Sequence, residues 1–168
     1  MKWFRLSAAQ GDADGETRLG VCYGEGAGIP MDSAEAAKWF RLETQKGNPA
    51  AQYALGNLYR LGNGVPLDLT ESTRLYRLAA DQGVEKAQHN LAAAYLGGWG
   101  VPVDAPQAVR LFQKLADKGY GVSQYELAMC YEGGMGVAQD AKLAEYWFKK
   151  AAAQGIEQAK EHLSSESH

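Results

Sequence analysis

The chain contains 168 residues, of which 46% are hydrophobic and 22% charged, and this balance is typical of a folded domain rather than a disordered chain. Its formal net charge of −3 provides no overall attraction for phosphate, so we expect no nucleic-acid partner. No apolar run approaches the roughly 18 residues that cross a bilayer, and the first residues are too short an apolar stretch for a secretory signal. We therefore expect no membrane insertion. The sequence does not fix the compartment: the chain as written is expected in the cytoplasm, or in the periplasm if a leader segment precedes it.

Residues of the same type recur every 36 positions along almost the whole chain. The columns formed in this way are Tyr23, Tyr59, Tyr95 and Tyr131; Asp32, Asp68, Asp104 and Asp140; Leu19, Leu55, Leu91 and Leu127; and Gly11, Gly47, Gly83, Gly119 and Gly155. An aromatic column runs through Phe4, Phe40, Tyr76, Phe112 and Phe148. Such a period predicts stacked copies of one supersecondary unit.

The copies follow one another without a gap. Residues 1–14 match the second half of a copy and predict a single helix that caps the array. Full copies are expected over residues 15–50, 51–86, 87–122 and 123–158, and residues 159–168 begin a further helix. The prediction is one all-α domain, a right-handed α/α solenoid of about four and a half 36-residue helix–turn–helix repeats.

The first helix of each copy, helix A, is indicated by its apolar face. In the second copy, apolar residues fall at i, i+4, i+7 and i+8, on one side of a helix, at Ala51, Leu55, Leu58 and Tyr59. The tyrosine at the end of this pattern recurs together with the leucine. We therefore expect Tyr59 and Tyr95 to be buried between the two helices of their own copies.

A glycine-rich turn leads from helix A to the second helix, helix B. Glycine permits the positive φ that the end of a helix often requires. Asp68 follows, and its carboxylate can accept amide hydrogens of the first turn of helix B. Glu71, three residues later, completes a pattern like a capping box. Leu143 after Asp140 breaks this pattern, so we expect a simpler cap in the last copy.

These columns resemble the Sel-one-like repeat family, a relative of the tetratricopeptide repeats. The shared pattern is A-x-x-x-L-G-x-x-Y, then G-x-G-V-x-x-D, A-x-x-W-F and A-A-x-x-G, and in the second copy it is matched by Ala51, Leu55, Gly56, Tyr59, Gly62, Gly64, Val65 and Asp68. Gly15 and Ile29 of the first copy depart from it. The resemblance implies an α/α superhelix with helix A on the concave side, and a family whose members are mostly scaffolds or adaptors.

The sequence contains no recognisable catalytic or metal-binding constellation. His89 lies in the body of the repeats, whereas His162 falls in the last helix and His168 ends the chain. No spacing of histidine, cysteine and glutamate resembles a metal site. The glycine-rich turns lack the pattern of a phosphate-binding loop. We therefore expect no enzyme activity, no metal and no cofactor.

The two cysteines occupy one column, three copies apart. With helices stacked at roughly 8 to 10 Å, Cys22 and Cys130 would lie on the order of 25 to 30 Å apart, whereas a disulfide needs Cα atoms within about 7 Å. A bridge between them is not expected. Because Leu58 and Ala94 share their column, we interpret both cysteines as small, buried apolar residues.

A stripe of varied residues lies on helix A opposite the leucine and tyrosine columns. In a stacked array, recurring columns pack copy on copy, and varied columns on one side are free to specify a ligand. The candidate binding residues in this stripe are Tyr53, Asn57, Arg60, His89, Leu96, Tyr125, Met129 and Glu132. Aromatic residues, methionine and arginine are concentrated at the centres of protein interfaces. The alternative is a solvated groove wall that binds nothing in particular.

Two other surfaces are candidates for binding. Basic residues recur on helix B, at Lys38, Arg74 and Arg110 in one column and Arg41, Arg77 and Lys149 in another. Glu35 and Glu71 precede Lys38 and Arg74 by three residues, the spacing of intrahelical ion pairs, so we expect a self-neutralising face rather than a site for nucleic acid or lipid. Trp99, in a turn, is a candidate hot spot. The alternative, which we favour, is that it packs against the adjacent turn.

We therefore expect a non-enzymatic scaffold or adaptor that binds a peptide or a folded protein on the concave face of its A helices. An alternative is an immunity protein or inhibitor that covers the active site of a toxin or enzyme, as some bacterial repeat proteins of this type do. A third possibility is an enzyme, or an accessory domain of a larger one. The oligomeric state is left open.

Overall fold

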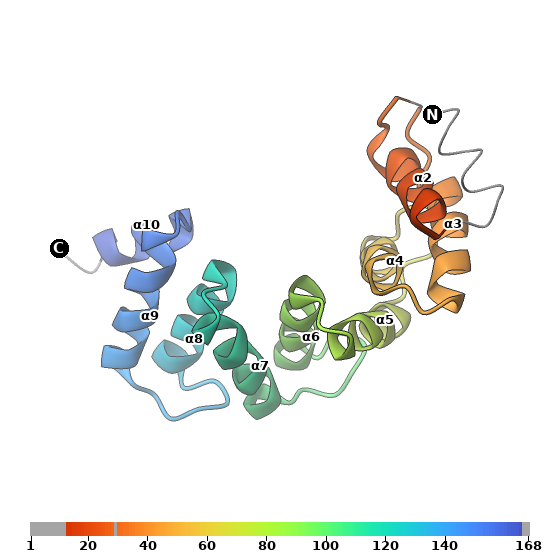
Figure 1. The fold of residues 1–168 in the computed structure, drawn as a ribbon. Coiled ribbons are helices and arrows are strands. Elements are labelled where there is room, and N and C mark those ends of the chain that lie inside the picture. The colour runs from red at the N-terminus through yellow and green to blue at the C-terminus, as the bar shows by residue number, and fades with distance from the viewer. Residues whose placement is uncertain (1–12, 29, 166–168) are drawn as a thin grey trace. The chain divides into compact units, whose positions relative to one another are not determined.

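The computed structural model describes residues 13–28 and 30–165, and within this part the chain forms nine α-helices and no strand (Figure 1). The helices are α2 (Ala13–Glu25), α3 (Ser33–Gln45), α4 (Pro49–Leu61), α5 (Leu69–Asp81), α6 (Glu85–Gly97), α7 (Ala105–Asp117), α8 (Gly121–Gly133), α9 (Ala141–Ala153) and α10 (Glu157–Ser165). The all-α helical repeat predicted from the sequence is confirmed. None of these helices is long and apolar enough to span a membrane.

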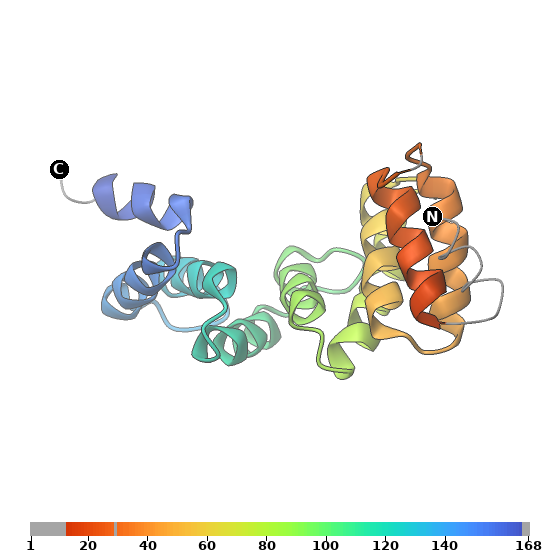
Figure 2. The same cartoon turned by 45° about the horizontal axis from the view of Figure 1, so that its top comes forward.

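The chain divides into two compact units, Met1–Gln88 and His89–His168. Even-numbered helices are the A helices of the repeats and odd-numbered helices are the B helices. In the first unit α3 packs against both α2 and α4, and α4 packs against α5; Figure 2 shows α2, α3 and α4 side by side. In the second unit α8 packs between α7 and α9, and α9 packs against α10. The cap helix predicted over residues 1–14 falls almost wholly outside the described residues, and Ala13 already belongs to α2.

Each described B helix begins at the aspartate that the sequence singled out. The carboxylates of Asp32, Asp68 and Asp104 each accept the backbone N–H three residues ahead at 2.9 Å. Asp140 accepts those of Lys142 and Leu143, both at 3.0 Å. The predicted aspartate N-caps are therefore confirmed, but the last cap is not simpler than the others, because Asp140 accepts two N–H groups.

The prediction that Glu71 completes a capping box is wrong. In a full box the Glu71 side chain would accept the backbone N–H of Asp68. That N–H instead donates to the carbonyl of Tyr59 at 3.0 Å, across the turn from helix A. The Glu71 carboxylate is left to pair with Arg74 on the same helix. The tyrosine column thus fixes the turn through its backbone.

The deepest residues are the aromatic side chains of the B helices. Phe40, Tyr76, Phe112 and Phe148 are 4%, 2%, 0% and 1% exposed, and the leucine column of helix A is also buried. Tyr59 and Tyr95 are only partly buried and pack against the edge of the core, which corrects the expectation that they fill it. Their rings lie near the end of helix A, where the turn leaves them partly open to solvent.

Small residues on helix A let the two helices of a copy approach closely. A Cβ atom on Gly56 would lie 2.9 Å from the ring of Tyr76, and one on Gly20 would lie 2.7 Å from the ring of Phe40. Alanine takes this place in the later copies, and Ala92 is completely buried. The recurring glycine or alanine therefore makes room for the helix B aromatic ring.

A polar contact between the start of helix A and the end of helix B of the same copy varies in its chemistry but keeps its place. It joins Gln52 to Gln82 at 2.8 Å and Gln124 to Gln154 at 2.7 Å. In the first copy Lys46 and Glu16 replace the two glutamines at 2.7 Å, and Lys46 also lies 2.8 Å from the buried Glu43. Burial raises the pKa of Glu43, but hydrogen bonds with Lys46, Glu16 and Asn48 outweigh burial and hold the pKa below its ordinary value of 4.5. An ion pair thus replaces an amide pair at the beginning of the described array.

In two A–B turns the second glycine packs on the preceding copy. Gly64 has a φ of +69°, and a Cβ atom there would collide with the backbone of Ser33 and Ala34. Gly136, with a φ of +72°, stands in the same relation to Ala105 and Pro106. The conformation and the close approach both require glycine.

Gly64→Ala should therefore destabilise the protein more than Gly83→Ala does. Both sites have a positive φ, +69° and +90°, but a Cβ atom on Gly83 would meet nothing within 4 Å. In each variant the left-handed backbone lowers the free energy of unfolding by about 1–2 kcal/mol. Gly64→Ala should lower it by about 1–3 kcal/mol more, because the backbone of Ser33 and Ala34 must shift. Urea unfolding of both variants measures this. Equal losses would show that the turn does not pack tightly on the preceding copy.

Candidate functional site

In the first unit, the structure gathers Tyr53, Asn57 and Arg60 of α4 around one side chain of α5. The ring of Tyr53 lies 6.0 Å from that of Tyr76, at an angle of 39°. The Tyr76 hydroxyl donates to Asn57 Oδ1 at 2.7 Å and accepts from Arg60 Nε at 3.2 Å. Arg60 is exposed, while Tyr53 and Asn57 are half-buried. A buried ring therefore positions an amide and a guanidinium on the outer face of α4.

Sequence reasoning missed the role of Tyr76. Its column contains phenylalanine in the other described copies, at Phe40, Phe112 and Phe148. A single hydroxyl in an otherwise apolar column was the available signal. A buried tyrosine hydroxyl needs a partner, and here the varied residues of helix A supply it.

In the second unit, His89 of α6 is held by an aromatic and polar environment. Its ring lies 5.5 Å from the ring of Phe112 and 5.9 Å from that of Tyr120, and its Nδ1 lies 2.9 Å from Ser123 Oγ. Burial lowers the pKa of His89, so the neutral imidazole is favoured near neutral pH. His89 can therefore offer a flat, uncharged ring to a partner.

One arrangement recurs in three copies. The first varied position of helix A carries a ring that tilts over the buried helix B ring of the same copy, in the pairs Tyr53 with Tyr76, His89 with Phe112, and Tyr125 with Phe148. The centroids lie 5.5 to 6.0 Å apart. All three outer rings are half-buried, so part of each ring packs against the core and part is open to solvent. They form a second aromatic layer that rests on the core.

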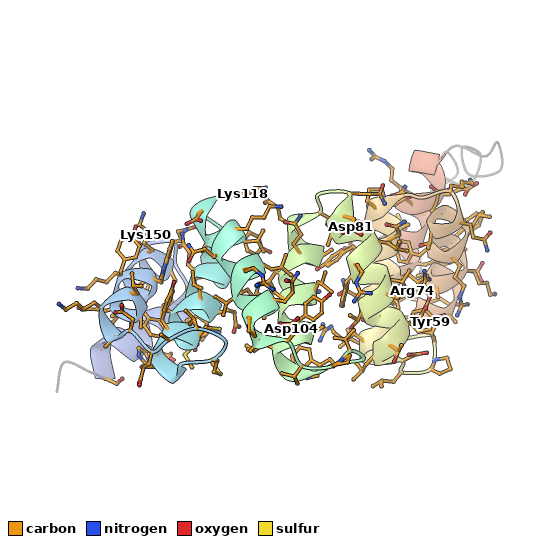
Figure 3. All side chains as sticks on the ribbon, turned by 90° about the horizontal axis from the view of Figure 1, so that it is seen from below. Tyr59, Arg74, Asp81, Asp104, Lys118 and Lys150 are labelled. Carbon is orange, nitrogen blue, oxygen red and sulfur yellow. The ribbon has the colours of Figure 1, made fainter. Side chains whose placement is uncertain are left out.

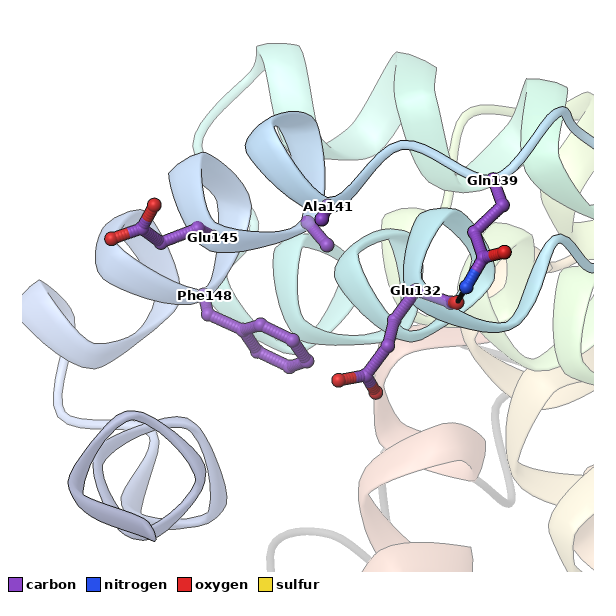
Figure 4. A pocket seen from close by; sticks show the side chains of 6 residues that line it. Glu132, Gln139, Ala141, Glu145 and Phe148 are labelled. Carbon is purple, nitrogen blue, oxygen red and sulfur yellow. Dashed lines mark hydrogen bonds between the residues drawn. The ribbon is translucent and has the colours of Figure 1, made fainter. Parts of the chain in front are cut away.

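The remaining varied residues of the second unit divide into two groups. Leu96 and Met129 are partly buried and pack against the hydrophobic core, so part of each side chain serves packing. Glu132 is half-buried, and its Oε1 lies 3.0 Å from His162 Nε2 of α10. Glu132 also lines a cavity between α8 and α9 (Figure 4).

Trp99 is partly exposed and packs on its own turn rather than on the adjacent one. It is 47% exposed. Its indole also lies against Gly97, where a Cβ atom would come within 2.6 Å of the ring. The side chain packs on its own turn and still offers an aromatic face to solvent.

The helix B face is largely self-neutralising, as predicted. Glu35 pairs with Lys38 at 2.7 Å, and Glu71 holds Arg74, labelled in Figure 3, through two hydrogen bonds of 2.6 and 2.7 Å. Lys149 pairs with Glu145 at 2.6 Å. Two arginines find neutral partners instead: Arg110 bonds to Gln107 at 2.7 Å, and Arg41 donates to the hydroxyl of Tyr59 at 3.1 Å.

Metal binding and thiol reactivity both depend on the titratable groups of the described residues. No group of three or more histidine, cysteine, aspartate and glutamate side chains among them is placed to hold a metal ion. Burial, aided by the charge of Glu126, raises the pKa of Cys130 to about 11, so this free thiol stays protonated at neutral pH. Cys22 is also a free thiol, but it is half-buried rather than buried as expected.

Tyr76→Phe should have a small effect on stability. The ring remains, as in the copies that carry phenylalanine, and the variant loses only the hydroxyl between Asn57 and Arg60. We expect a loss of about 0.5–1.5 kcal/mol in the free energy of unfolding, against about 3–5 kcal/mol for Tyr76→Ala, which removes the ring. Denaturant unfolding of the two variants provides the measurement. A Tyr76→Phe variant as unstable as Tyr76→Ala would contradict this account of the site.

Comparison with known proteins identifies the repeat. The Sel1 repeat family model matches the chain at residues 1–12, 13–47, 49–84, 85–120 and 121–156. The crystal structure of a Sel1 repeat protein from Oxalobacter formigenes is 34% identical, with a TM-score of 0.87, over 94% of this chain and 63% of that one. No curated protein matches the chain.

Two further solved structures are similar. One is c5321, a protective antigen present in uropathogenic Escherichia coli strains and displaying an SLR fold; it is 33% identical, with a TM-score of 0.67, over 95% of this chain and 42% of that one. The chain thus spans less than two thirds of the length of the Oxalobacter formigenes protein and of c5321. The other, a putative sel1 repeat protein from Klebsiella pneumoniae subsp. pneumoniae, is 16% identical with a TM-score of 0.56, covers 99% of this chain and 98% of that one, and supports the fold alone.

Proposed function

The chain belongs to the Sel1 repeat family, whose fold is generally a protein–protein interaction scaffold, and on this premise we propose that it is a non-enzymatic adaptor. Its partner, a peptide or a folded protein, binds along the varied face of the A helices. In a superhelix of this kind that face is the concave one. The candidate residues lie on α4 in the first unit and on α6 and α8 in the second.

The observation that supports this proposal is the second aromatic layer formed by Tyr53, His89 and Tyr125. Each ring rests on a buried ring of its own copy, so it is held in place before a partner arrives. Aromatic side chains fixed in this way offer contact area at a low cost in conformational entropy. The buried layer beneath them recurs from copy to copy, whereas this layer varies, as expected of residues that specify a ligand.

The polar groups beside this layer can make directional hydrogen bonds with a partner. Asn57 and Arg60 lie beside Tyr53 in the first unit, held by the hydroxyl of Tyr76. Arginine and tyrosine are enriched among the residues that dominate binding energy at interfaces. By contrast, the cations of the helix B face are mostly paired within their own helices, and exposed pairs of this kind contribute little to binding.

The test replaces Tyr53 and Tyr125 together by alanine. Peptides selected on the wild-type protein from a phage-displayed random library serve as ligands, and calorimetry measures their affinity. We expect the double variant to bind at least about 2 kcal/mol more weakly, the threshold for hot-spot residues. Because both rings are half-buried, Tyr53→Phe with Tyr125→Phe is made in parallel; it keeps the rings and should retain binding.

The matched control is Arg41→Ala with Arg77→Ala on helix B, which should leave binding intact. If this pair abolishes binding while the tyrosine pair does not, the helix A face is not the site and the basic face takes its place. A partner isolated from the host with the same protein would extend the test. If that partner were an enzyme that loses activity in the complex, the role would be inhibition rather than assembly.

A further inference from the structure

Three polar groups of the second copy stand where the other full copies carry different residues. The position of Asn57 holds valine, alanine or methionine in those copies, that of Arg60 holds glycine, leucine or glutamate, and that of Tyr76 holds phenylalanine. The three groups are also bonded to one another, because the Tyr76 hydroxyl donates to Asn57 and accepts from Arg60. They therefore form one set that belongs to this copy and not to the repeat in general.

Arg60 is not needed to satisfy the Tyr76 hydroxyl. A buried tyrosine hydroxyl requires an acceptor for its hydrogen, and Asn57 Oδ1 already provides one at 2.7 Å. Arg60 is exposed, and its Nε donates to the same hydroxyl at 3.2 Å. This bond therefore ties a long, exposed side chain to a fixed point of the core, and it holds the guanidinium in one orientation.

The guanidinium keeps most of its donors for another group. It carries five N–H donors in one plane, and the one on Nε is bonded to Tyr76. Among the residues that the structure describes, the two Nη groups of Arg60 meet no acceptor. Lys38 and Arg74 of the helix B face, by contrast, are paired with glutamates of their own helices. Arg60 is thus a positive charge that the fold positions without a counter-charge from the described residues.

The free donors suit a carboxylate. The two oxygens of a carboxylate match two parallel N–H groups of a guanidinium, and pairs of this kind are stronger than hydrogen bonds between neutral groups. Phosphorylated peptides are recognised by clusters of arginine. The set of Asn57, Arg60 and Tyr76 contains a single cation, which fits the single charge of a carboxylate.

The position of Arg60 along its helix favours a side-chain carboxylate over a chain terminus. Terminal carboxylates are captured in nests of free backbone N–H groups. Asn57 and Arg60 lie in the second half of α4, where the backbone N–H groups are bonded within the helix. This part of α4 therefore offers a side chain and no nest.

We propose that Arg60 binds the carboxylate of an aspartate or glutamate side chain of the protein partner, and that Tyr76 positions it for this contact. The ring of Tyr53, 6.0 Å from the ring of Tyr76, provides an aromatic surface in the same copy for the apolar part of the partner. This inference rests on the proposed function and names the chemistry of one contact.

The test uses the full chain and short peptides as probes. Acetyl-Leu-Glu-Leu-amide is titrated into isotope-labelled protein, and NMR follows the side-chain Nε–H of Arg60 and the backbone of residues 53–60. We expect both to shift. Acetyl-Leu-Gln-Leu-amide has the same shape without the charge, and it should bind at least about tenfold more weakly, because a hydrogen bond to a charged group is worth that factor.

Two further probes identify the source of the anion. Acetyl-Leu-Gln-Leu with a free terminal carboxylate carries the same charge at the chain end, and acetyl-Leu-phosphoserine-Leu-amide carries a phosphate. Neither should bind more tightly than the glutamate peptide. Tighter binding of the first would assign the site to a chain terminus, and tighter binding of the second to a phosphate; either result would overturn the proposal.

Variants locate the contact. Arg60→Leu, which introduces the residue that the third copy carries at this position, should lower the affinity for the glutamate peptide to that for the glutamine peptide. Tyr76→Phe keeps the ring and releases the arginine. It should weaken the glutamate peptide about threefold and leave the glutamine peptide unchanged, a difference that a purely structural role would not produce. Arg74→Leu makes the same change in net charge on the helix B face of the first unit and should have no effect.

Four results would contradict the proposal: equal binding of the glutamate and glutamine peptides, full binding of the glutamate peptide by Arg60→Leu, wild-type affinity in Tyr76→Phe, or no response to the glutamate peptide. Circular dichroism of each variant checks that the helices are retained. The outcome is separable from that of the tyrosine experiment. Library peptides lost in the tyrosine variant, with no effect of Arg60→Leu on the glutamate peptide, would remove the ion pair and keep the helix A face. A glutamate peptide held by Arg60, with normal library binding by the tyrosine variant, would do the reverse.

Discussion

The fold depends on the contact between a small residue of helix A and a buried ring of helix B. Gly20 against Phe40 shows it most clearly, because even one added carbon would meet the ring at 2.7 Å. This approach draws the two helices of a copy together, and the aspartate cap and the turn glycine fix the connection between them. The same unit then repeats every 36 residues, and the turns at Gly64 and Gly136 pack on the copy before them. Local contacts of this kind are what makes a repeat protein stable.

The buried ring also links stability to the binding surface. It supports the core on one side and carries the outer ring of Tyr53, His89 or Tyr125 on the other. The inner layer can stay constant while the outer layer changes from copy to copy. A surface built in this way is rigid without being fixed in sequence, and both properties suit an adaptor.

Periodicity predicted most of the fold, because a 36-residue spacing leaves little freedom in where helices and turns fall. Asp68 could be recognised as a cap from its position alone. The partner of the Glu71 side chain could not be predicted, because it depends on whether the Asp68 N–H donates to the Tyr59 carbonyl across the turn. Column variation pointed to Tyr53 but not to its support by Tyr76, because a contact between two helices follows from their packing distance. The cavity lined by Glu132 could not be predicted from the sequence either, because its lining comes from two helices and the turn between them.

The central claim is that a partner binds to the A helices. Hydrogen exchange followed by mass spectrometry, on the chain with and without a saturating library-selected peptide, tests it most directly. The account predicts added protection in the segments of α4 and α8 that carry Tyr53 and Tyr125, with little change in the exposed faces of α5 and α9. Protection concentrated on the B helices around Arg74 and Lys149, with α4 and α8 unchanged, would contradict it.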